Sequence, residues 1–116
     1  MTRHAADLLV EEKENHMGGE GHLAIRHILT SPDELLNKGR AFAHSTLEPG
    51  ASIGYHIHEG ESEIYYIYSG EGEINDNGTT IPVKPGDAIV TPNGHGHGIR
   101  NTGEEALHFI ALILYA

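Results

Sequence analysis

Three histidines and one glutamate have the types and the spacing of a metal site. His56 and His58 are separated by one residue, Glu63 follows five positions later, and His97 lies further along the chain. Side chains two apart on a strand point to the same side, with Cα atoms roughly 6–7 Å apart, so the first two can present their imidazoles to one point. Neighbouring strands that carry the other two would add a third nitrogen and a carboxylate, and such a set binds divalent transition metals. The spacing therefore predicts one divalent metal ion per chain, held by these four side chains.

The residues around these ligands make the chain similar to the cupins. In that family the first motif is a glycine, five residues, His-x-His, three or four residues, a glutamate, six residues and a glycine, and the chain matches it from Gly50 to Gly70. The second motif is a glycine, five residues, Pro-x-Gly, two residues, a histidine, three residues and an asparagine, which the chain matches from Gly86 to Asn101. The resemblance implies an all-β double-stranded β-helix, a jelly-roll barrel with the metal inside one end, and a homodimer. It favours manganese or iron, although imidazole and carboxylate ligands leave zinc, nickel and cobalt open.

Short strands must position these ligands, because turn residues recur at short intervals through the second part of the chain. Such regular spacing is typical of a sandwich or barrel. Strand parity puts Gly54 on the side of His56 and His58, and Tyr65 on the side of Glu63. From the patterning between the turns we expect strands near 41–47, 52–58, 62–68, 71–75, 79–83, 87–91, 96–101 and 106–115.

Two of the expected strands are apolar on both faces. The segments at 62–68 and 106–115 contain IYYIY and FIALILY. One face of a single barrel wall would contact water, so a second layer or a partner subunit has to cover it. We expect the tyrosines to be packing residues at such a surface rather than catalytic phenols: Tyr65, Tyr66, Tyr68 and Tyr115.

The segment before the barrel is less regular. Residues 1–21 are polar and have no sustained apolar period, so they would form a mobile arm, a strand exchanged with a partner subunit, or a flap near the barrel mouth. The alternation at 22–29 predicts a strand, and Ser31 predicts the start of one short helix that ends by Gly39. The chain then divides into an N-terminal region at 1–40, packed on the barrel or on a partner, and a barrel at 41–116.

Length and composition narrow the class of protein. The 116 residues suffice for one core. Acidic residues outnumber basic ones 17 to 7, for a formal charge of −10, which argues against a nucleic-acid partner. The absence of cysteine excludes disulfides and thiolate metal sites. No run approaches the roughly 20 apolar residues that span a membrane, and no signal peptide is recognisable at the start, so we expect a cytoplasmic protein.

Other side chains with acid–base chemistry lie near the motifs. His95, in the loop before His97, is the candidate for a catalytic acid–base group at the barrel mouth, with an exposed loop histidine as the alternative. Glu59 and Glu61 are expected to be exposed turn residues and are the nearest spare carboxylates. Structural roles are expected for two histidines on strands: His44 and His108.

Within the cupins, the chain looks most like the small single-domain proteins labelled oxalate-decarboxylase-like. In the oxalate decarboxylases an arginine that helps to hold the substrate stands three residues before the first motif histidine, where this sequence has Ile53. A dianion in a buried site needs a compensating charge, which Arg26 or Arg100 would have to supply. The resemblance implies a metal-dependent enzyme acting on a small oxygen-rich metabolite, by decarboxylation or by dioxygen-dependent C–C cleavage. The alternatives are a metal-dependent sugar or sugar-acid isomerase and a non-catalytic module that binds a metal and a small metabolite.

Overall fold

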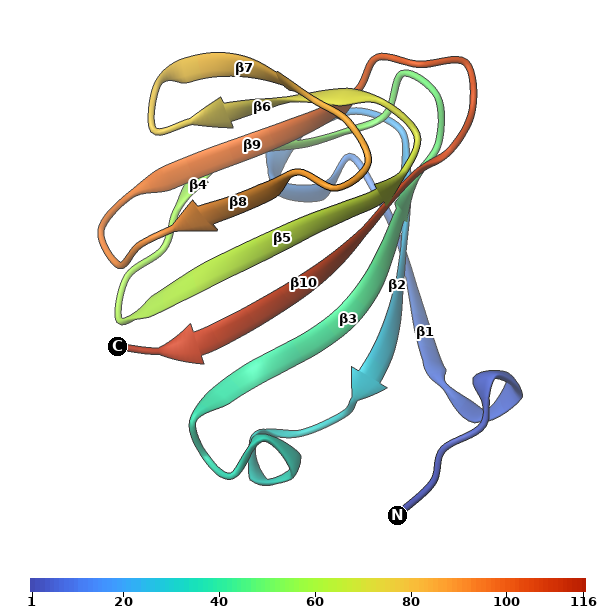
Figure 1. Cartoon of the computed structure of the whole chain (residues 1–116), viewed down its shortest axis with the longest axis vertical. Helices are drawn as coiled ribbons and strands as arrows, with labels where there is room; N and C mark the ends of the chain where they lie inside the picture. The colour runs from blue at the N-terminus through green and yellow to red at the C-terminus, as the bar shows by residue number, and fades with distance from the viewer.

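Two antiparallel sheets face each other in the computed structural model, which describes residues 1–116 (Figure 1). The larger sheet contains, in spatial order, β1 (Leu9–Glu14), β2 (His22–Leu29), β3 (Gly39–Leu47), β10 (Leu107–Tyr115), β5 (Glu61–Ser69) and β8 (Ala88–Thr91). The smaller sheet contains β4 (Ser52–Ile57), β9 (Gly96–Asn101), β6 (Gly72–Asp76) and β7 (Thr79–Val83). Three 3-10 turns complete the elements: η1 (Ala5–Asp7), η2 (His16–Gly18) and η3 (Pro32–Leu35).

The predicted all-β jelly roll is confirmed, and each predicted strand is present with its ends within two residues of the expected ones. The short helix expected after Ser31 is present only as the single turn η3. The Ser31 hydroxyl bonds the Asp33 carboxylate, at 2.7 Å, instead of capping the helix. Leu36 and Asn37 then adopt left-handed backbone angles, which end the turn before Gly39. No helix is long and apolar enough to cross a membrane.

The strand β1 was not predicted, because its sequence LVEEKE has no apolar period. Backbone pairing with β2 makes it a strand, in an unbroken register from Leu9 opposite His27 to Glu14 opposite His22. It forms the edge of the larger sheet and continues into η2, which lies against β4 of the smaller sheet. The N-terminal segment therefore crosses from one sheet to the other.

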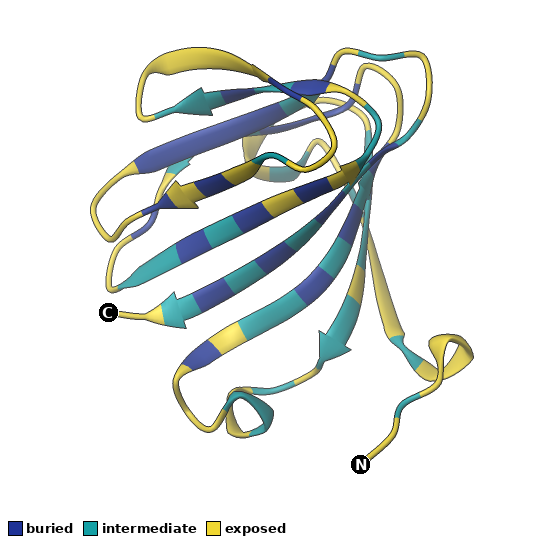
Figure 2. Cartoon of the chain, viewed as in Figure 1, coloured by how far each residue is buried: buried dark blue, intermediate teal, exposed yellow.

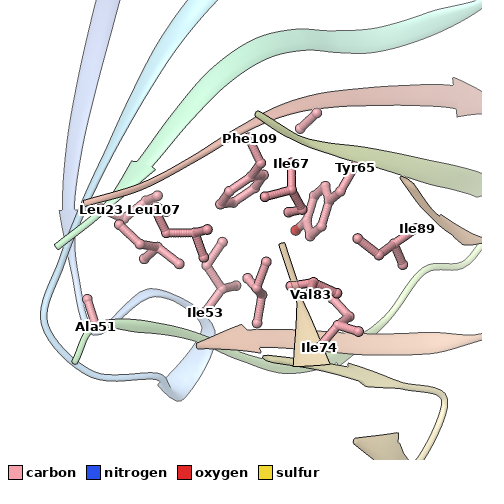
Figure 3. Packing of buried hydrophobic residues seen from close by; sticks show 13 residues of the cluster. Leu23, Ala51, Ile53, Tyr65, Ile67, Ile74, Val83, Ile89, Leu107 and Phe109 are labelled. Carbon is pink, nitrogen blue, oxygen red and sulfur yellow. The ribbon is translucent and has the colours of Figure 1, made fainter. Parts of the chain in front are cut away.

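The core lies between the two sheets, and burial alternates along the central strands (Figure 2). Phe109 and Ile67 from the larger sheet meet Ile53 and Ile74 from the smaller one (Figure 3). Leu107 is the first residue of β10 and is paired with the last residue of β3. Apolar side chains fill this end of the barrel. Polar side chains gather toward the other end of the same strands, where the candidate site lies.

The outer face of the larger sheet is also apolar. Tyr66 is 48% exposed and Val90 is 59% exposed on neighbouring strands, and the sheets pack on each other through their inner faces, so no second layer of this chain covers these residues. His44 and His108 lie on this face, and His44 Nε2 is 3.0 Å from His108 Nδ1. The Tyr68 hydroxyl is 2.6 Å from the same His44 nitrogen. Both histidines are therefore members of a surface hydrogen-bond cluster, away from the barrel interior.

Candidate metal centre

The structure brings His56, His58, Glu63 and His97 together, with one potential ligand atom from each lying within 4.8 Å of the others. His56 on β4 is directly opposite His97 on β9 in the smaller sheet. His58 directly follows β4. Its backbone is hydrogen-bonded to the loop before β9, so it continues the ladder that joins β4 to β9. Glu63 comes from β5 and reaches the imidazoles from the opposite sheet. The group therefore closes only when the two sheets pack.

The distances within this group suit a bound cation. His58 Nε2 and His97 Nε2 are 3.0 Å apart, and each is 3.0 Å from Glu63 Oε1. At metal–ligand lengths near 2.1 Å, two ligand atoms at a right angle are separated by about 3.0 Å. The three atoms thus stand where a single divalent ion would place them.

The outer nitrogens of the three imidazoles are already engaged, which leaves each Nε2 for the centre. His56 Nδ1 donates to the Gly54 carbonyl oxygen at 2.7 Å, and His58 Nδ1 donates to the Glu61 carboxylate at 3.0 Å. His97 Nδ1 lies 2.8 Å from the Thr91 hydroxyl. A carbonyl or a carboxylate can only accept, so in their neutral form the first two rings carry the proton on Nδ1 and a lone pair on Nε2. Such outer partners orient metal-binding histidines.

The electrostatics agree with a cation site. Burial raises the pKa of the Glu63 carboxyl, but the adjacent His58 and His97 imidazoles outweigh burial and lower it to about 2. Hydrogen bonding to Glu63 raises the pKa of His58, whereas burial lowers the pKa of His56. The site thus combines an ionised carboxylate with ring nitrogens that converge on it, and a buried charge of this kind requires a cationic partner. The residues present therefore fit a divalent metal, which would displace any proton held there.

Tyr65 is part of the site wall. Its ring stacks on His97 with the centroids 4.8 Å apart, and it contacts Phe109 on the other side. Tyr65 is buried and points inward, as its strand parity with Glu63 predicts. The expectation that Tyr65 packs at the outer surface with Tyr66 and the other tyrosines is therefore wrong. Burial raises the pKa of Tyr65 well above its ordinary value, so the phenol stays neutral. It links the metal centre to the apolar core.

Glu61 is not the exposed turn residue expected from the sequence. Its side chain is only 14% exposed, and it bridges His58 and Arg40. The Arg40 guanidinium donates two hydrogen bonds to the carboxylate, at 2.6 and 2.7 Å, and holds the pKa of Glu61 below its usual range. Glu61 therefore fixes the ring orientation and the tautomer of His58 from outside the ligand group.

Changing Glu61 to glutamine should weaken metal binding about 10–100-fold, which is the usual effect of losing an outer carboxylate partner of a ligand histidine. The amide keeps the size of the side chain but loses the charge that favours the His58 Nδ1 proton. Competition titration with a chromophoric chelator would measure the change. The Glu59→Gln variant removes the same charge from the exposed neighbouring turn and should bind metal like the unmodified protein. Equal affinities of the Glu61 and Glu59 variants would contradict the assigned role.

A cavity of about 330 Å³ adjoins the metal ligands. His56, His58 and Glu63 line it from the barrel, and Lys13 and His16 line it from the N-terminal segment. This volume is at the small end for ligand sites and suits a metabolite of a few heavy atoms. The cavity thus combines three of the candidate metal ligands with polar groups from the N-terminal segment.

Three residues considered from the sequence do not line this cavity. His95 is exposed, and its backbone rather than its ring is bonded to His58. Arg26 is exposed on β2 and is paired in register with His44, whose side chain is on the outer face. Arg100 bonds the Gly50 carbonyl oxygen and lies beside a separate groove. The compensating charge for an anion has to come from another residue.

Sequence patterns left a flap near the barrel mouth as one of three alternatives for residues 1–21, and in the structure part of this segment lines the cavity. Its approach depends on Gly19 and Gly54, because a Cβ at Gly19 would lie 2.2 Å from the Ser52 carbonyl oxygen and one at Gly54 would lie 2.0 Å from the Met17 carbonyl oxygen. The paired glycines allow η2 to lie directly on β4, which brings His16 to the cavity. The GGEG stretch beginning at Gly18 was the available signal, but a glycine pair in sequence does not reveal its partner strand.

Comparison with known proteins agrees with the fold and the motifs. The cupin domain family profile matches residues 43–113. An oxalate-binding protein from Thermotoga maritima is 44% identical over 114 residues, which cover 98% of this chain and 93% of that protein. The crystal structure of a predicted oxalate decarboxylase from Thermotoga maritima superposes with a TM-score of 0.95 at 43% identity, with 100% of each chain covered. The polyketide cyclase RemF from Streptomyces resistomycificus has a TM-score of 0.74 at 26% identity, covering 99% of this chain and 79% of that one.

Proposed function

The chain belongs to the cupin family, and from this premise we propose that it binds one divalent metal and, on that metal, a short oxygen-rich acid. The observation that carries the proposal is the convergence of three imidazoles and the ionised Glu63 beside a small cavity. His56, His58, Glu63 and His97 would hold the ion. Manganese or iron is favoured, and zinc, nickel or cobalt would also accept these ligands.

Oxalate is the first ligand to test. The name of the relative from Thermotoga maritima states that it binds oxalate, and the aligned region spans nearly all of both chains. A short dicarboxylate suits the cavity because it can chelate a metal and still fit within about 330 Å³. Ile53 lines the cavity at the position of the substrate-holding arginine of the oxalate decarboxylases, so recognition of the anion would differ from theirs.

We further propose that the bound acid is transformed, by decarboxylation or by dioxygen-dependent C–C cleavage. A bound divalent cation would polarise a coordinated carboxylate or carbonyl and, as Fe(II) or Mn(II), would bind dioxygen. The chain itself contributes the orienting ligands, and the buried Tyr65 and Ile53 limit water in the cavity. The catalytic role of His95 stays a prediction of the sequence, without support from its exposed position.

Binding without catalysis is the second candidate, and the word "binding" in the name of that relative favours it. The isomerase predicted as an alternative would need a base beside the bound substrate. Carbon dioxide release without oxygen uptake would identify a decarboxylase, oxygen uptake would identify an oxygenase, and binding without turnover would identify the non-catalytic module.

The test begins with untagged protein purified without added metal. Plasma mass spectrometry should find about one equivalent of manganese or iron, and calorimetry on this protein should then detect oxalate binding that disappears after the metal is removed with a chelator. Protein that holds no metal, even after reconstitution, would contradict the proposal. Oxalate binding that is unchanged in the metal-free protein would contradict the part that places the acid on the metal.

We also propose that the protein is a homodimer that forms through the apolar outer face of the larger sheet. Exposed apolar patches of this kind mark interaction surfaces, and a chain of 116 residues gains appreciable stability from a partner. Cytoplasmic location stays a prediction from the sequence.

A further inference from the structure

The cavity beside the metal ligands is also lined by polar side chains from elements outside the two motif segments. Lys13 on β1, His16 on η2 and Ser45 on β3 form this second wall, and none of the three is a candidate metal ligand. The wall exists because β1 pairs with β2 at the edge of the larger sheet and the chain then continues into η2, which packs on β4 of the smaller sheet.

The polar groups of this wall have unused hydrogen-bonding capacity. Lys13 Nζ lies 3.6 Å from Glu11 Oε2 and makes no hydrogen bond, although its side chain is only 38% exposed. The His16 ring and the Ser45 hydroxyl also make none, and Ser45 is 4% exposed and faces the cavity. No buried side-chain atom lacks a hydrogen-bond partner, so the Ser45 hydroxyl is open to the cavity and can bond a molecule there.

The other cation on the cavity wall is already engaged. Arg40 donates two hydrogen bonds to Glu61, which in turn orients His58, so moving Arg40 toward a ligand would disturb the metal site. Glu11 bonds His27 Nε2 through its Oε1, at 2.5 Å, and its Oε2 is the atom that forms the ion pair with Lys13. Lys13 is thus the cationic side chain on this wall that is held by an ion pair of 3.6 Å alone, without a hydrogen bond.

We propose that Lys13, supported by His16 and Ser45, binds the oxygens that a metal-chelating dicarboxylate or 2-oxo acid turns away from the metal. The inference rests on the proposed function and assigns the specificity of the same site. A divalent ion and Glu63 together carry a net charge of about +1, so a dianion leaves the centre at about −1. The Lys13 ammonium can offset that charge by turning from Glu11, whose other oxygen stays bonded to His27. In this chain Lys13 therefore supplies the compensating cation that Ile53 does not.

The assignment has a consequence for selectivity. An acid with one carboxylate uses both of its oxygens on the metal and leaves none for the second wall. Lys13 should therefore contribute to the binding of oxalate or malonate and contribute little to the binding of acetate. A residue with a purely structural role would affect both classes alike.

The test compares Lys13→Gln with Lys84→Gln in metal-loaded protein, using calorimetry with oxalate, malonate and acetate. Lys84 lies in an exposed turn outside the cavity, so its replacement removes the same charge without touching the wall. We expect the Lys13 variant to bind the dicarboxylates at least about tenfold more weakly, in line with the loss of one charge-assisted contact, and to bind acetate as before. Metal content should equal that of the unmodified protein, and Lys13→Arg should restore part of the dicarboxylate affinity.

Three outcomes would overturn the inference alone, with metal-dependent oxalate binding still intact. They are equal loss of affinity in the Lys13 and Lys84 variants, equal loss for oxalate and acetate in the Lys13 variant, and unchanged oxalate affinity in the Lys13 variant. A metal-loaded protein that binds none of the three acids would instead overturn the proposed function, and this inference with it.

Discussion

Replacing His58 or Glu63 by alanine should give a folded protein that retains no metal. Each side chain supplies one of four ligand atoms, and His58 Nε2 and Glu63 Oε1 are 3.0 Å apart, so the loss of either opens one side of the group. The fold should persist, because the core is formed by apolar residues of the two sheets and not by the ligands. Plasma mass spectrometry should show a fall from about one equivalent to a small fraction of one, with an unchanged β-sheet circular dichroism spectrum.

His95→Ala is the matched control for this experiment. It removes an imidazole from the same region, but its ring is exposed and lies outside the cavity, so the variant should retain its metal. Should the alanine variant at Glu63 unfold, Glu63→Gln preserves the volume while removing the charge, and it should also lose the metal. A His58 or Glu63 variant that is folded and holds stoichiometric metal would refute the ligand assignment.

Replacing Tyr66 by arginine should convert a dimer into monomers. Tyr66 projects from β5 on the apolar outer face, where it is paired with Ala88 of β8 and is diagonal to the exposed Val90. Burying an arginine against the same apolar face of a second copy would leave its charge without a partner, which costs several kcal/mol. Truncation of a central interface tyrosine alone typically costs about 2 kcal/mol or more, so the dimer dissociation constant should rise by at least about 30-fold. Light scattering over a concentration series would measure this change.

Thr80→Arg provides the comparison for this surface. Thr80 is exposed on β7 and lines a groove of the smaller sheet that contains no residue of the larger sheet, so its replacement adds the same charge outside the proposed interface. That variant should have the mass of the unmodified protein. A protein that is monomeric before mutation, or dimers that survive the change at Tyr66 and dissociate on the change at Thr80, would contradict the proposed interface.

Local sequence patterns predicted most strands and the four residues that come together at the candidate site. Period-two alternation is a property of the strand itself, so parity alone placed His56 and His58 on one side and Tyr65 beside Glu63. The same patterns missed β1, because an edge strand with one solvated face and several charges has no apolar period to recognise. Its pairing with β2 depends on backbone hydrogen bonds, to which side-chain type contributes little.

The fold class and the four candidate ligands can be recognised from the sequence, because motif spacing and alternation are encoded within single strands and their turns. Which other groups surround these four residues depends on the tertiary structure. Glu61 is turned toward His58 by Arg40 from a different strand, and His95 is held by its backbone with its ring in solvent. Lys13 lines the cavity because β1 pairs with β2 at the edge of the larger sheet. These placements depend on contacts between segments far apart in the chain, which no local period specifies.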